Sequence, residues 1–240
     1  MRAIMLAGGR ATRLESLSPT VPKALTPIIG HLLLDILLSQ LCEAGYDHVT
    51  LCVGHLEEVV RAHVGDGSRA GVAVDYVNDH GRLGTAGPLQ LVDAWEEPAL
   101  VLNADLLTDL AFGEMAARHA ASGAAITLAV REYVTHLDVG VVQCDGDGGV
   151  VAIVEKPELR QLLTLGIYMI DPEVRSHLRP AQRTDMPELV NRVIESGGHV
   201  RTFVHSGRWH DIGTPAGLGA AEDTLGACPA AFGVTERTGP

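Results

Sequence analysis

Glycines and cations near the N-terminus have the residue types and spacing of a phosphate-binding loop. Gly8 and Gly9 interrupt a short apolar run, and the cations Arg10, Arg13 and Lys23 follow within the next fifteen residues. Glycine has no Cβ, so backbone N–H groups there can approach a ligand closely. A glycine turn after a strand, combined with fixed positive charge, suits a phosphate chain. A tight turn with solvated arginines is the alternative, and this stretch alone does not decide between them.

Two carboxylates, Asp105 and Asp211, are the candidate metal ligands. Each lies just after a run that is predicted to form a strand. Two converging carboxylates together with substrate phosphates are a usual environment for Mg²⁺. A single Asp at a strand end is more often a turn or helix-cap residue. The pair, combined with a phosphate-binding loop, predicts a Mg²⁺ site.

The elements that must position these residues alternate between strands and helices in the first half of the chain. Apolar runs predict strands over 3–6, 49–53, 72–77, 99–102 and 125–130, and helical spacing predicts helices over 32–41, 56–64, 88–95 and 113–121. Strands that alternate with helices through short connections form a mostly parallel sheet covered on both faces. We therefore expect a single-domain, three-layer α/β/α fold with a Rossmann-like, mostly parallel mixed sheet.

In the second half of the chain the predicted strands and helices no longer alternate regularly. Two short strands, 139–143 and 150–154, flank a turn of aspartates and glycines, which is typical of a hairpin. A strand over 165–170, a helix over 187–195, a strand over 200–204 and a helix over 215–225 follow. We expect this half to extend the sheet and to form one wall of a cleft. The domain is expected to span 1–225, with a loosely ordered tail over 226–240.

Polar motifs follow several of the predicted strands. In an open α/β sheet a ligand lies beyond the carboxyl ends of the strands. The residues at those ends are 8–9, 103–105, 155–157 and, after a turn, 209–213. Their convergence predicts one site at this edge of the sheet.

These motifs together resemble the sugar-1-phosphate nucleotidylyltransferases, also called NDP-sugar pyrophosphorylases, over almost the whole chain. The small mannose- and heptose-1-phosphate guanylyltransferases look most similar. The matching segments, in the family's order and spacing, are Leu6-Ala7-Gly8-Gly9-x-x-Thr12-Arg13-Leu14 with Pro22-Lys23, Leu83-Gly84-Thr85-Ala86-Gly87, Asn103-Ala104-Asp105, Val154-Glu155-Lys156-Pro157, Gly166-Ile167-Tyr168 and Trp209-x-Asp211-Ile212-Gly213.

The resemblance implies that a sugar 1-phosphate oxygen attacks the α-phosphorus of a nucleoside triphosphate and that pyrophosphate leaves. Catalysis of this kind is mostly positioning and charge neutralisation. It implies Arg13 and Lys23 as catalytic residues and Asp105 and Asp211 as ligands of Mg²⁺. The implied nucleotide-binding residues are Leu6, Ala7, Gly8, Gly9, Gly84, Thr85, Ala86, Gly87 and Asn103. The implied sugar-phosphate-binding residues are Gly140, Glu155, Lys156, Thr164 and Gly166.

Two departures from the family's pattern bear on activity and substrate. Ala11 stands where the family usually has glycine, and a position that needs φ > 0 would be strained by its methyl group. Thr164-Leu165 stands where the family usually has Asn-Ala, so an amide that reaches sugar hydroxyls is replaced by one hydroxyl. This favours a sugar other than plain glucose, such as another hexose, a heptose or a cyclitol.

The nucleotide base is left open by the sequence. The size of the chain favours GTP, while UTP, dTTP, ATP and CTP are alternatives. A non-catalytic module that binds nucleotide sugars is a further alternative, which Ala11 favours and the retained Arg13, Lys23, Asp105 and Asp211 oppose.

Composition restricts the partners. A formal charge of −12 argues against a nucleic-acid or anionic-membrane binder. No apolar run approaches the ~20 residues that cross a bilayer. Four widely spaced cysteines form no metal-binding pattern and are expected to be reduced thiols of a cytoplasmic protein. The expected partners are a nucleoside triphosphate and a sugar 1-phosphate, and a homo-oligomer is compatible with the sequence.

Overall fold

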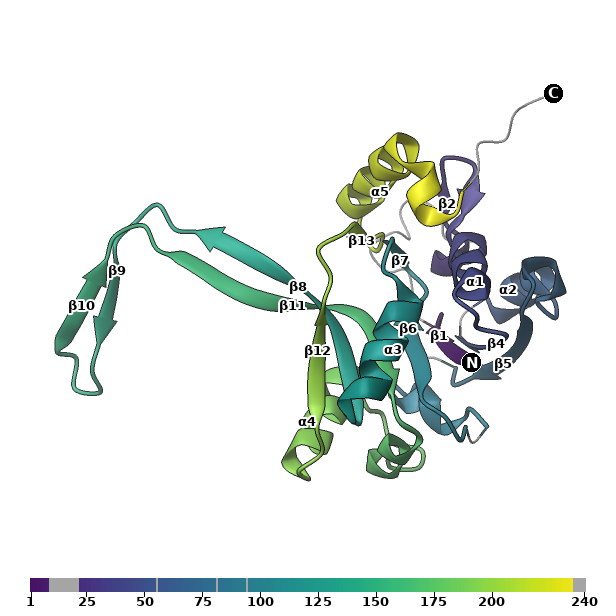
Figure 1. Cartoon of the computed structure of the whole chain (residues 1–240), viewed down its shortest axis with the longest axis horizontal. Coiled ribbons are helices and arrows are strands. Elements are labelled where there is room, and N and C mark those ends of the chain that lie inside the picture. The colour runs from purple at the N-terminus through teal and green to yellow at the C-terminus, as the bar shows by residue number, and fades with distance from the viewer. Residues whose placement is uncertain (9–21, 55, 81, 94, 235–240) are drawn as a thin grey trace.

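A seven-stranded mixed sheet forms the centre of the protein in the computed structural model, which describes residues 1–8, 22–54, 56–80, 82–93 and 95–234 (Figure 1). Its strands are β1 (Arg2–Leu6), β4 (His48–Val53), β5 (Ala73–Asn78), β6 (Ala99–Asn103), β8 (Ile126–His136), β11 (Glu158–Ile170) and β12 (Val200–Val204). Their order is β12-β8-β11-β6-β1-β4-β5. Neighbours are parallel except where β11 pairs antiparallel with β6 and β8. The predicted mostly parallel mixed sheet is confirmed.

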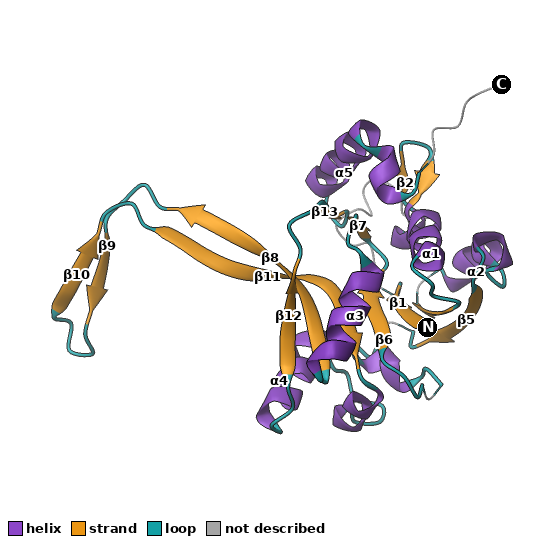
Figure 2. Cartoon of the chain, in the orientation of Figure 1, coloured by secondary structure: helices purple, strands orange, loops and turns teal. Residues whose placement is uncertain are grey.

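Helices cover both faces of this sheet (Figure 2). They are α1 (Leu33–Glu43), α2 (Glu57–Val64), α3 (Phe112–Ser122), α4 (Met186–Glu195) and α5 (Pro215–Ala227). The end of α1 illustrates how sequence sets these bounds. Gly45 adopts φ +85°, a left-handed conformation that glycine takes without a Cβ penalty, and it turns the chain toward β4. The helix therefore stops where its glycine predicts.

Alternation along the strands divides the interior into two cores. In β1, Ala3 and Met5 pack on the side of α1 and α3, whereas Ile4 packs on the side of α4. Successive side chains of a strand point to opposite faces, so an almost wholly apolar strand serves both cores. All three residues are fully buried. The three-layer α/β/α architecture follows from this.

The prediction of a helix over 88–95 is wrong. This stretch forms only a short 3₁₀ helix over Gly87–Gln90. The side-chain amide of Gln90 donates to the carbonyl of Gln182 at 3.3 Å and accepts from the N–H of Ala181 at 3.0 Å. Contacts to a distant loop thus take the place of a continued helix.

The second half of the chain differs most from expectation. β8 and β11 run well past the predicted 125–130 and 165–170 and form a two-stranded ribbon that leaves the body (Figure 1). The predicted hairpin, β9 (Val141–Cys144) with β10 (Val150–Val154), is present and lies at the far end of that ribbon. The second half extends the sheet through β11 and β12 and supplies Arg183 and Asp185 to the wall of a cavity, as expected, whereas the ribbon itself projects outward.

The residues after 226 are more ordered than predicted as far as 234. Helix α5 continues to Ala227, and a 3₁₀ helix covers Pro229–Phe232. The side chain of Phe232 is fully buried in the core shared with α1. Burial of an aromatic ring holds this stretch, so the expectation of a loose tail is wrong for 226–234. Residues 235–240 lie outside the described part of the chain.

Candidate active site

The carboxyl ends of β1 and β6 meet at one edge of the sheet, and a cavity of about 360 Å³ lies there. Register brings Leu6 beside Asn103, and the N–H of Ala104 donates to the carbonyl of Leu6 at 3.1 Å. Eight of the predicted site residues line this cavity, namely Leu6, Ala7, Gly8, Lys23, Gly84, Thr85, Asn103 and Asp105. The strand ends at Gly8 and 103–105 thus meet at this cavity as expected, whereas 155–157, expected at the same edge, do not line it.

Lys23 forms the centre of an ion cluster on the cavity wall. It begins a 3₁₀ helix over Lys23–Leu25, and its ammonium pairs with the carboxylate of Asp105. The Nζ atom also lies 3.9 Å from Oδ1 of Asp211. The side chains of Lys23 and Asp105 are about four-fifths buried, whereas that of Asp211 is half exposed. One cation thus stands against both predicted metal ligands.

A short strand pair, which sequence reasoning missed, brings the two aspartates together. Strand β7 (Leu106–Thr108) directly follows Asp105, and β13 (Trp209–Asp211) ends at Asp211. The two strands pair antiparallel with Asp211 opposite Leu106, and the N–H of Ile212 donates to the carbonyl of Asp105 at 3.1 Å. Residues a hundred positions apart are held side by side in this way.

Gly213 fits closely against this cluster. Its N–H donates to Oδ1 of Asp211 at 2.7 Å. A Cβ at Gly213 would lie 2.8 Å from that oxygen and would also contact Nζ of Lys23. A larger residue would therefore displace the lysine or the aspartate.

The donor set at this edge fits a hard divalent cation. Within the described part of the chain no three His, Cys, Asp or Glu side chains come together as a metal site. The Asp105–Asp211 pair supplies two carboxylates, of which Asp105 lines the cavity. Mg²⁺ is bound in this way, by one or two carboxylates plus phosphate and water oxygens.

A second wall of the cavity comes from the loop 83–87 and the start of α4, which are clamped together. Backbone N–H groups of Ala86 and Gly87 both donate to the carbonyl of Thr184, at 2.9 and 3.0 Å. The Thr85 hydroxyl accepts from the N–H of Met186 at 2.8 Å, and the Thr85 N–H donates to Asp185 at 3.0 Å. Ala86 and Gly87 are buried behind the cavity, so of the predicted loop only Gly84 and Thr85 line it.

Arg183 and Asp185 line the cavity and were not predicted. The guanidinium of Arg183 pairs with the carboxylate of Asp185 at 3.0 Å. Asp185 stands directly before α4, where sequence suggests only a helix cap. Its carboxylate instead faces the loop 83–87, and no local pattern reports that pairing.

Cys52 and Asp79 form another unpredicted part of the lining, next to Gly8. Asp79 is buried, and its carboxylate accepts from the N–H of Leu83 at 2.9 Å. Burial raises the pKa of the Cys52 thiol well above its usual range, and Asp79 and Asp75 raise it further. Cys52 is therefore a neutral, apolar part of the wall.

On the predicted sugar side, Gly166 lies next to the cavity residue Asn103. Gly166 adopts φ +72°, and a Cβ there would lie 2.7 Å from the amide nitrogen of Asn103. The pairing of β11 with β8 shifts register between Thr164 and Tyr168. The Thr164 hydroxyl lies 3.3 Å from that of Tyr168, whose pKa is raised by burial.

The remaining sugar-side predictions lie on the projecting ribbon. Gly140, Glu155 and Lys156 flank the hairpin β9–β10, away from the cavity lining (Figure 1). A Cβ at Gly140 would lie 3.1 Å from Oε2 of Glu155, so these residues are neighbours. Gly9 and Arg13, with Arg10 and Ala11, lie outside the described residues.

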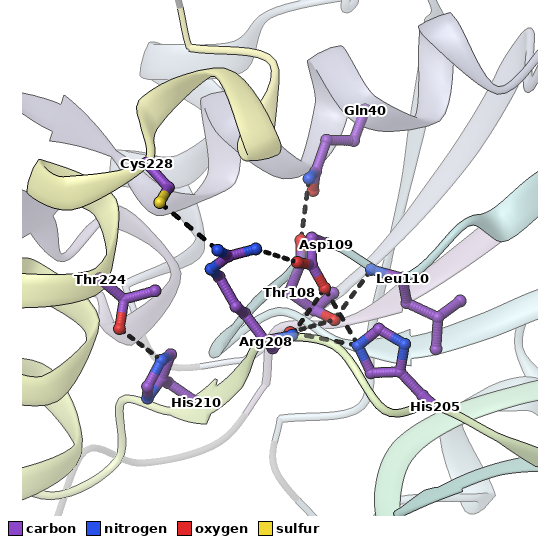
Figure 3. A network of polar contacts seen from close by, with 9 residues as sticks. All are labelled: Gln40, Thr108, Asp109, Leu110, His205, Arg208, His210, Thr224 and Cys228. Atoms are coloured by element: carbon purple, nitrogen blue, oxygen red, sulfur yellow. Dashed lines mark hydrogen bonds and ion pairs between the residues drawn. The ribbon is translucent and has the colours of Figure 1, made fainter.

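A network of polar contacts joins the residue that follows β7 to the residue that precedes β13 (Figure 3). Asp109 accepts from the N–H of Arg208 at 2.7 Å and pairs with its guanidinium at 3.1 Å. His205 lies 3.1 Å from the same carboxylate. Thr108 donates its hydroxyl to the carbonyl of Arg208 at 3.1 Å. The hydrogen bond to Asp109 raises the pKa of Arg208, with Cys228 adding to the shift.

Comparison with known proteins gives a consistent result. The model of the family described as "Nucleotidyl transferase" matches residues 2–226. The catalytic subunit beta of mannose-1-phosphate guanylyltransferase from Danio rerio is 32% identical over 225 residues, covering 90% of this chain and 62% of that protein. UTP–glucose-1-phosphate uridylyltransferase from Synechocystis sp. is 29% identical, covering 89% and 60%. Mannose-1-phosphate guanylyltransferase from Mycobacterium tuberculosis is 29% identical, covering 95% and 66%. This chain thus spans about three-fifths to two-thirds of the length of these relatives.

Solved structures support the fold. A Bacillus anthracis protein described as a glucose-1-phosphate thymidylyltransferase superposes with a TM-score of 0.76 at 20% identity, covering 93% of this chain and 95% of that one. HddC from Yersinia pseudotuberculosis superposes with a TM-score of 0.70 at 22% identity, covering 93% and 99%. Within the described residues no helix has the length and hydropathy to cross a membrane.

Proposed function

The chain belongs to the nucleotidyl transferase family, and on that premise we propose that it joins a nucleoside triphosphate to a sugar 1-phosphate and releases pyrophosphate. In this reaction a phosphate oxygen of the sugar 1-phosphate forms a bond to the α-phosphorus. The bond from that phosphorus to the oxygen bridging to the β-phosphate breaks, and pyrophosphate leaves with the electron pair. The attacking oxygen is already anionic at neutral pH, so no general base is needed.

Placement of the reacting groups and neutralisation of their charge then supply most of the rate. Lys23 contributes a positive charge where phosphates would enter the cavity, and its close contact with Asp105 holds that charge in place. Arg13 is proposed to stabilise the departing pyrophosphate. Lysine acts on phosphates as a point charge and arginine as a two-pronged donor, so the two roles are complementary.

Asp105 and Asp211 are proposed to be the residues that would hold Mg²⁺. The bound ion would supply further neutralisation of phosphate charge. The aspartates' own contribution is position, since the β7–β13 pair fixes their backbones relative to each other. The ammonium of Lys23 balances part of their charge.

The nucleotide is proposed to bind between β1 and the loop 83–87. Leu6, Ala7, Gly8 and Gly9 would face the phosphates and ribose, and Gly84, Thr85 and Asn103 would lie by the base and ribose. The cavity of about 360 Å³ supports this arrangement, because its lining includes each of these residues that the structure describes. Ala86 and Gly87 do not line the cavity and would contribute by fixing the conformation of the loop 83–87.

GTP is the proposed nucleotide, and a hexose, heptose or cyclitol 1-phosphate the proposed acceptor. Support for GTP comes from the Danio and Mycobacterium relatives, which are guanylyltransferases, while the Synechocystis relative makes UTP the alternative. Gly140, Glu155, Lys156, Thr164 and Gly166 are proposed for the sugar side. The cytoplasm is the proposed location, because it supplies nucleoside triphosphates and because all four cysteines are free thiols.

The observation that carries this proposal is the ion cluster in which Lys23 and Asp105, both on the wall of the strand-end cavity, meet Asp211. The test is a matrix of GTP, UTP, dTTP, ATP and CTP against hexose, heptose and cyclitol 1-phosphates, with Mg²⁺, read by pyrophosphate release. We expect turnover with at least one pair, strongest with GTP. Binding of a nucleotide sugar without turnover of any pair would favour the non-catalytic module instead.

A further inference from the structure

The ion cluster of Lys23, Asp105 and Asp211 contains two carboxylates and one ammonium, so its formal charge is negative. The ammonium pairs with Asp105, and its Nζ atom lies 3.9 Å from Oδ1 of Asp211. The side chains of Lys23 and Asp105 are about four-fifths buried, and salt screens partly buried charges less than exposed ones. The cluster therefore favours the approach of a further cation and opposes that of a lone anion.

The rest of the described cavity lining does not supply the missing positive charge. Among the lining residues that the structure describes, the other cation is Arg183, and its guanidinium is paired with Asp185 at 3.0 Å. The carboxylate of Asp79 also belongs to this lining, which thus has three carboxylates against two cations. A triphosphate that enters without a metal ion meets a wall whose described cations are already paired.

The ammonium of Lys23 contacts the same carboxylates that are the proposed ligands of the metal ion. Oδ2 of Asp105 is in contact with Nζ. Oδ1 of Asp211 faces Nζ and accepts from the N–H of Gly213 at 2.7 Å. A divalent ion that binds these carboxylates stands beside a second positive charge, and like charges repel strongly at a partly buried site. Each of the two cations therefore weakens the binding of the other.

Lys23 can give up its contact with Asp105 when another anion is within reach. Lysine carries a compact charge on a flexible four-carbon stem and needs no fixed donor geometry. The carbonyl of Lys23 is held by the N–H of Thr26 at 3.1 Å and by the Thr26 hydroxyl at 2.7 Å, whereas the side chain lines the cavity. The stem can thus turn toward a phosphate while the backbone stays in place.

We propose that Lys23 and a divalent cation compete for the carboxylates of Asp105 and Asp211, and that a phosphate of the nucleotide takes over the ammonium when the ion binds. The phosphate frees the carboxylates by drawing the ammonium away, and the ion reverses the charge that opposes the phosphate. The ion and the triphosphate therefore assist each other's binding, and such a coupling is reciprocal. The inference rests on the proposed function, because it takes both as ligands of this cavity.

The first test is a titration of the full chain with Mn²⁺ alone, with free Mn²⁺ followed by electron paramagnetic resonance. Mn²⁺ shares the preference of Mg²⁺ for oxygen ligands. Lys23→Met removes the competing charge and should bind Mn²⁺ about 10- to 100-fold more tightly than the wild type, the usual size of a coupling between two ligands. Addition of Asp105→Asn to Lys23→Met should abolish this gain.

The control for the loss of one positive charge is Arg69→Met. Arg69 is an exposed residue of the 3₁₀ helix Ser68–Ala70 and does not line the cavity. We expect this variant to bind Mn²⁺ as the wild type does. A variant that is merely destabilised would bind the ion more weakly, so a gain of affinity in Lys23→Met cannot arise from misfolding.

The second test uses the wild type labelled with ¹³C at the lysine Cε atoms. Lys23 and Lys156 are the two lysines of the sequence, so the spectrum has two signals, which Lys156→Arg assigns. Saturating Mg²⁺ should move the Lys23 signal toward its position in Asp105→Asn and leave the Lys156 signal in place. Millimolar tripolyphosphate with a chelator of divalent ions should move the Lys23 signal away from its position in the protein alone.

Equal or weaker Mn²⁺ binding by Lys23→Met would overturn the proposal, as would a Lys23 signal that either Mg²⁺ or tripolyphosphate leaves unmoved. Neither readout needs turnover. Pyrophosphate release by the wild type without the gain of affinity would contradict this inference alone. The gain of affinity without turnover of any substrate pair would contradict the proposed function alone.

Discussion

Thr85 and Asp185 lie a hundred positions apart and clamp the loop 83–87 to the start of α4. The backbone N–H of Thr85 donates to Oδ1 of Asp185 at 3.0 Å, and the Thr85 hydroxyl accepts from the N–H of Met186 at 2.8 Å. Thr85 thus caps a helix that belongs to another part of the sequence. The loop expected beside the base is positioned by this contact.

Removal of the Thr85 hydroxyl should weaken nucleotide binding. In Thr85→Val the first turn of α4 loses a cap worth about 1 kcal/mol, and the loop loses its anchor. We expect the KM for the nucleoside triphosphate to rise about tenfold with kcat nearly unchanged, the pattern of lost uniform binding. Steady-state kinetics checks this. Thr85→Ser keeps the hydroxyl and should behave as wild type, so equal impairment of both variants would refute the role of the cap.

Gly84 should tolerate no side chain. It adopts φ +80°, and a Cβ there would lie 2.6 Å from Oδ1 of Asp185 and 2.7 Å from the carbonyl of Thr184. Gly84→Ala is expected to lose most activity and more stability than the roughly 1–2 kcal/mol of left-handed strain. Gly30 is the control, because it has φ +78° with nothing within 4 Å of its Cβ position. In urea unfolding Gly30→Ala should show the strain alone, with activity kept. The same loss in both variants would mean that the contact with Asp185 has no effect.

Asp109 should stabilise the strand pair that aligns the two candidate metal ligands. Its carboxylate accepts from the N–H and guanidinium of Arg208 and lies beside His205, and it is 15% exposed. Asp109→Ala is expected to cost about 1–3 kcal/mol and to raise the Mg²⁺ concentration needed for half-maximal activity. Urea unfolding and a Mg²⁺ titration measure the two effects.

The matched control for Asp109 is Glu114→Ala. Glu114 pairs with Arg118 at 2.7 Å, but both side chains are more than half exposed. Surface pairs contribute about 0–1 kcal/mol, and this one lies away from the cavity. An unchanged Mg²⁺ requirement in Asp109→Ala would remove the link between this network and the metal ligands.

Cys52 should resist alkylation while Cys144 reacts. Burial raises the pKa of the Cys52 thiol, and Asp79 and Asp75 raise it further, so the reactive thiolate is scarce at pH 8. The side chain is also only 3% exposed, whereas Cys144, at the end of β9, is exposed. Iodoacetamide labelling followed by peptide mass spectrometry should show Cys52 reacting roughly 100-fold more slowly. In denaturant both should label. Rapid labelling of native Cys52 would contradict its buried, neutral state.

Local sequence signals predicted the centre of the fold and one side of the cavity. Buried strands such as Ala99–Asn103 are continuous apolar runs, and the polar residue after each run is fixed to the strand end by covalent geometry. Asp105 and Gly8 were therefore found without knowledge of tertiary contacts, because a parallel sheet brings such ends together.

The partners that come from elsewhere in the chain were not predictable in this way. Asp185 precedes a helix, where a carboxylate normally caps the helix itself. Asp185 instead accepts from the N–H of Thr85, and this contact depends on how two loops that are distant in sequence pack together. No residue near Asp185 in the sequence indicates that packing. Likewise β7 and β13 are three residues each, too short for a periodic pattern.

The outward extension of β8 and β11 escaped prediction for a different reason. The segments around Tyr133 and Leu159 contain β-branched, aromatic and aliphatic residues, as an ordinary half-buried strand does. The two-residue period of their side chains is also that of an ordinary strand. Alternation reports that one face is apolar but not what covers it. A face that is buried against the body and a face that stays exposed have the same pattern.

The most direct test of the proposed reaction is Mg²⁺-dependent pyrophosphate release by the wild type, Asp105→Asn and Asp223→Asn, with the best substrate pair and with folding followed by circular dichroism. Asp105 contacts Lys23 at the cavity, whereas Asp223 is an exposed residue of α5. We predict that Asp105→Asn folds and loses about 10²–10³-fold in kcat, while Asp223→Asn keeps full activity. Full activity in folded Asp105→Asn would contradict the assignment of the site.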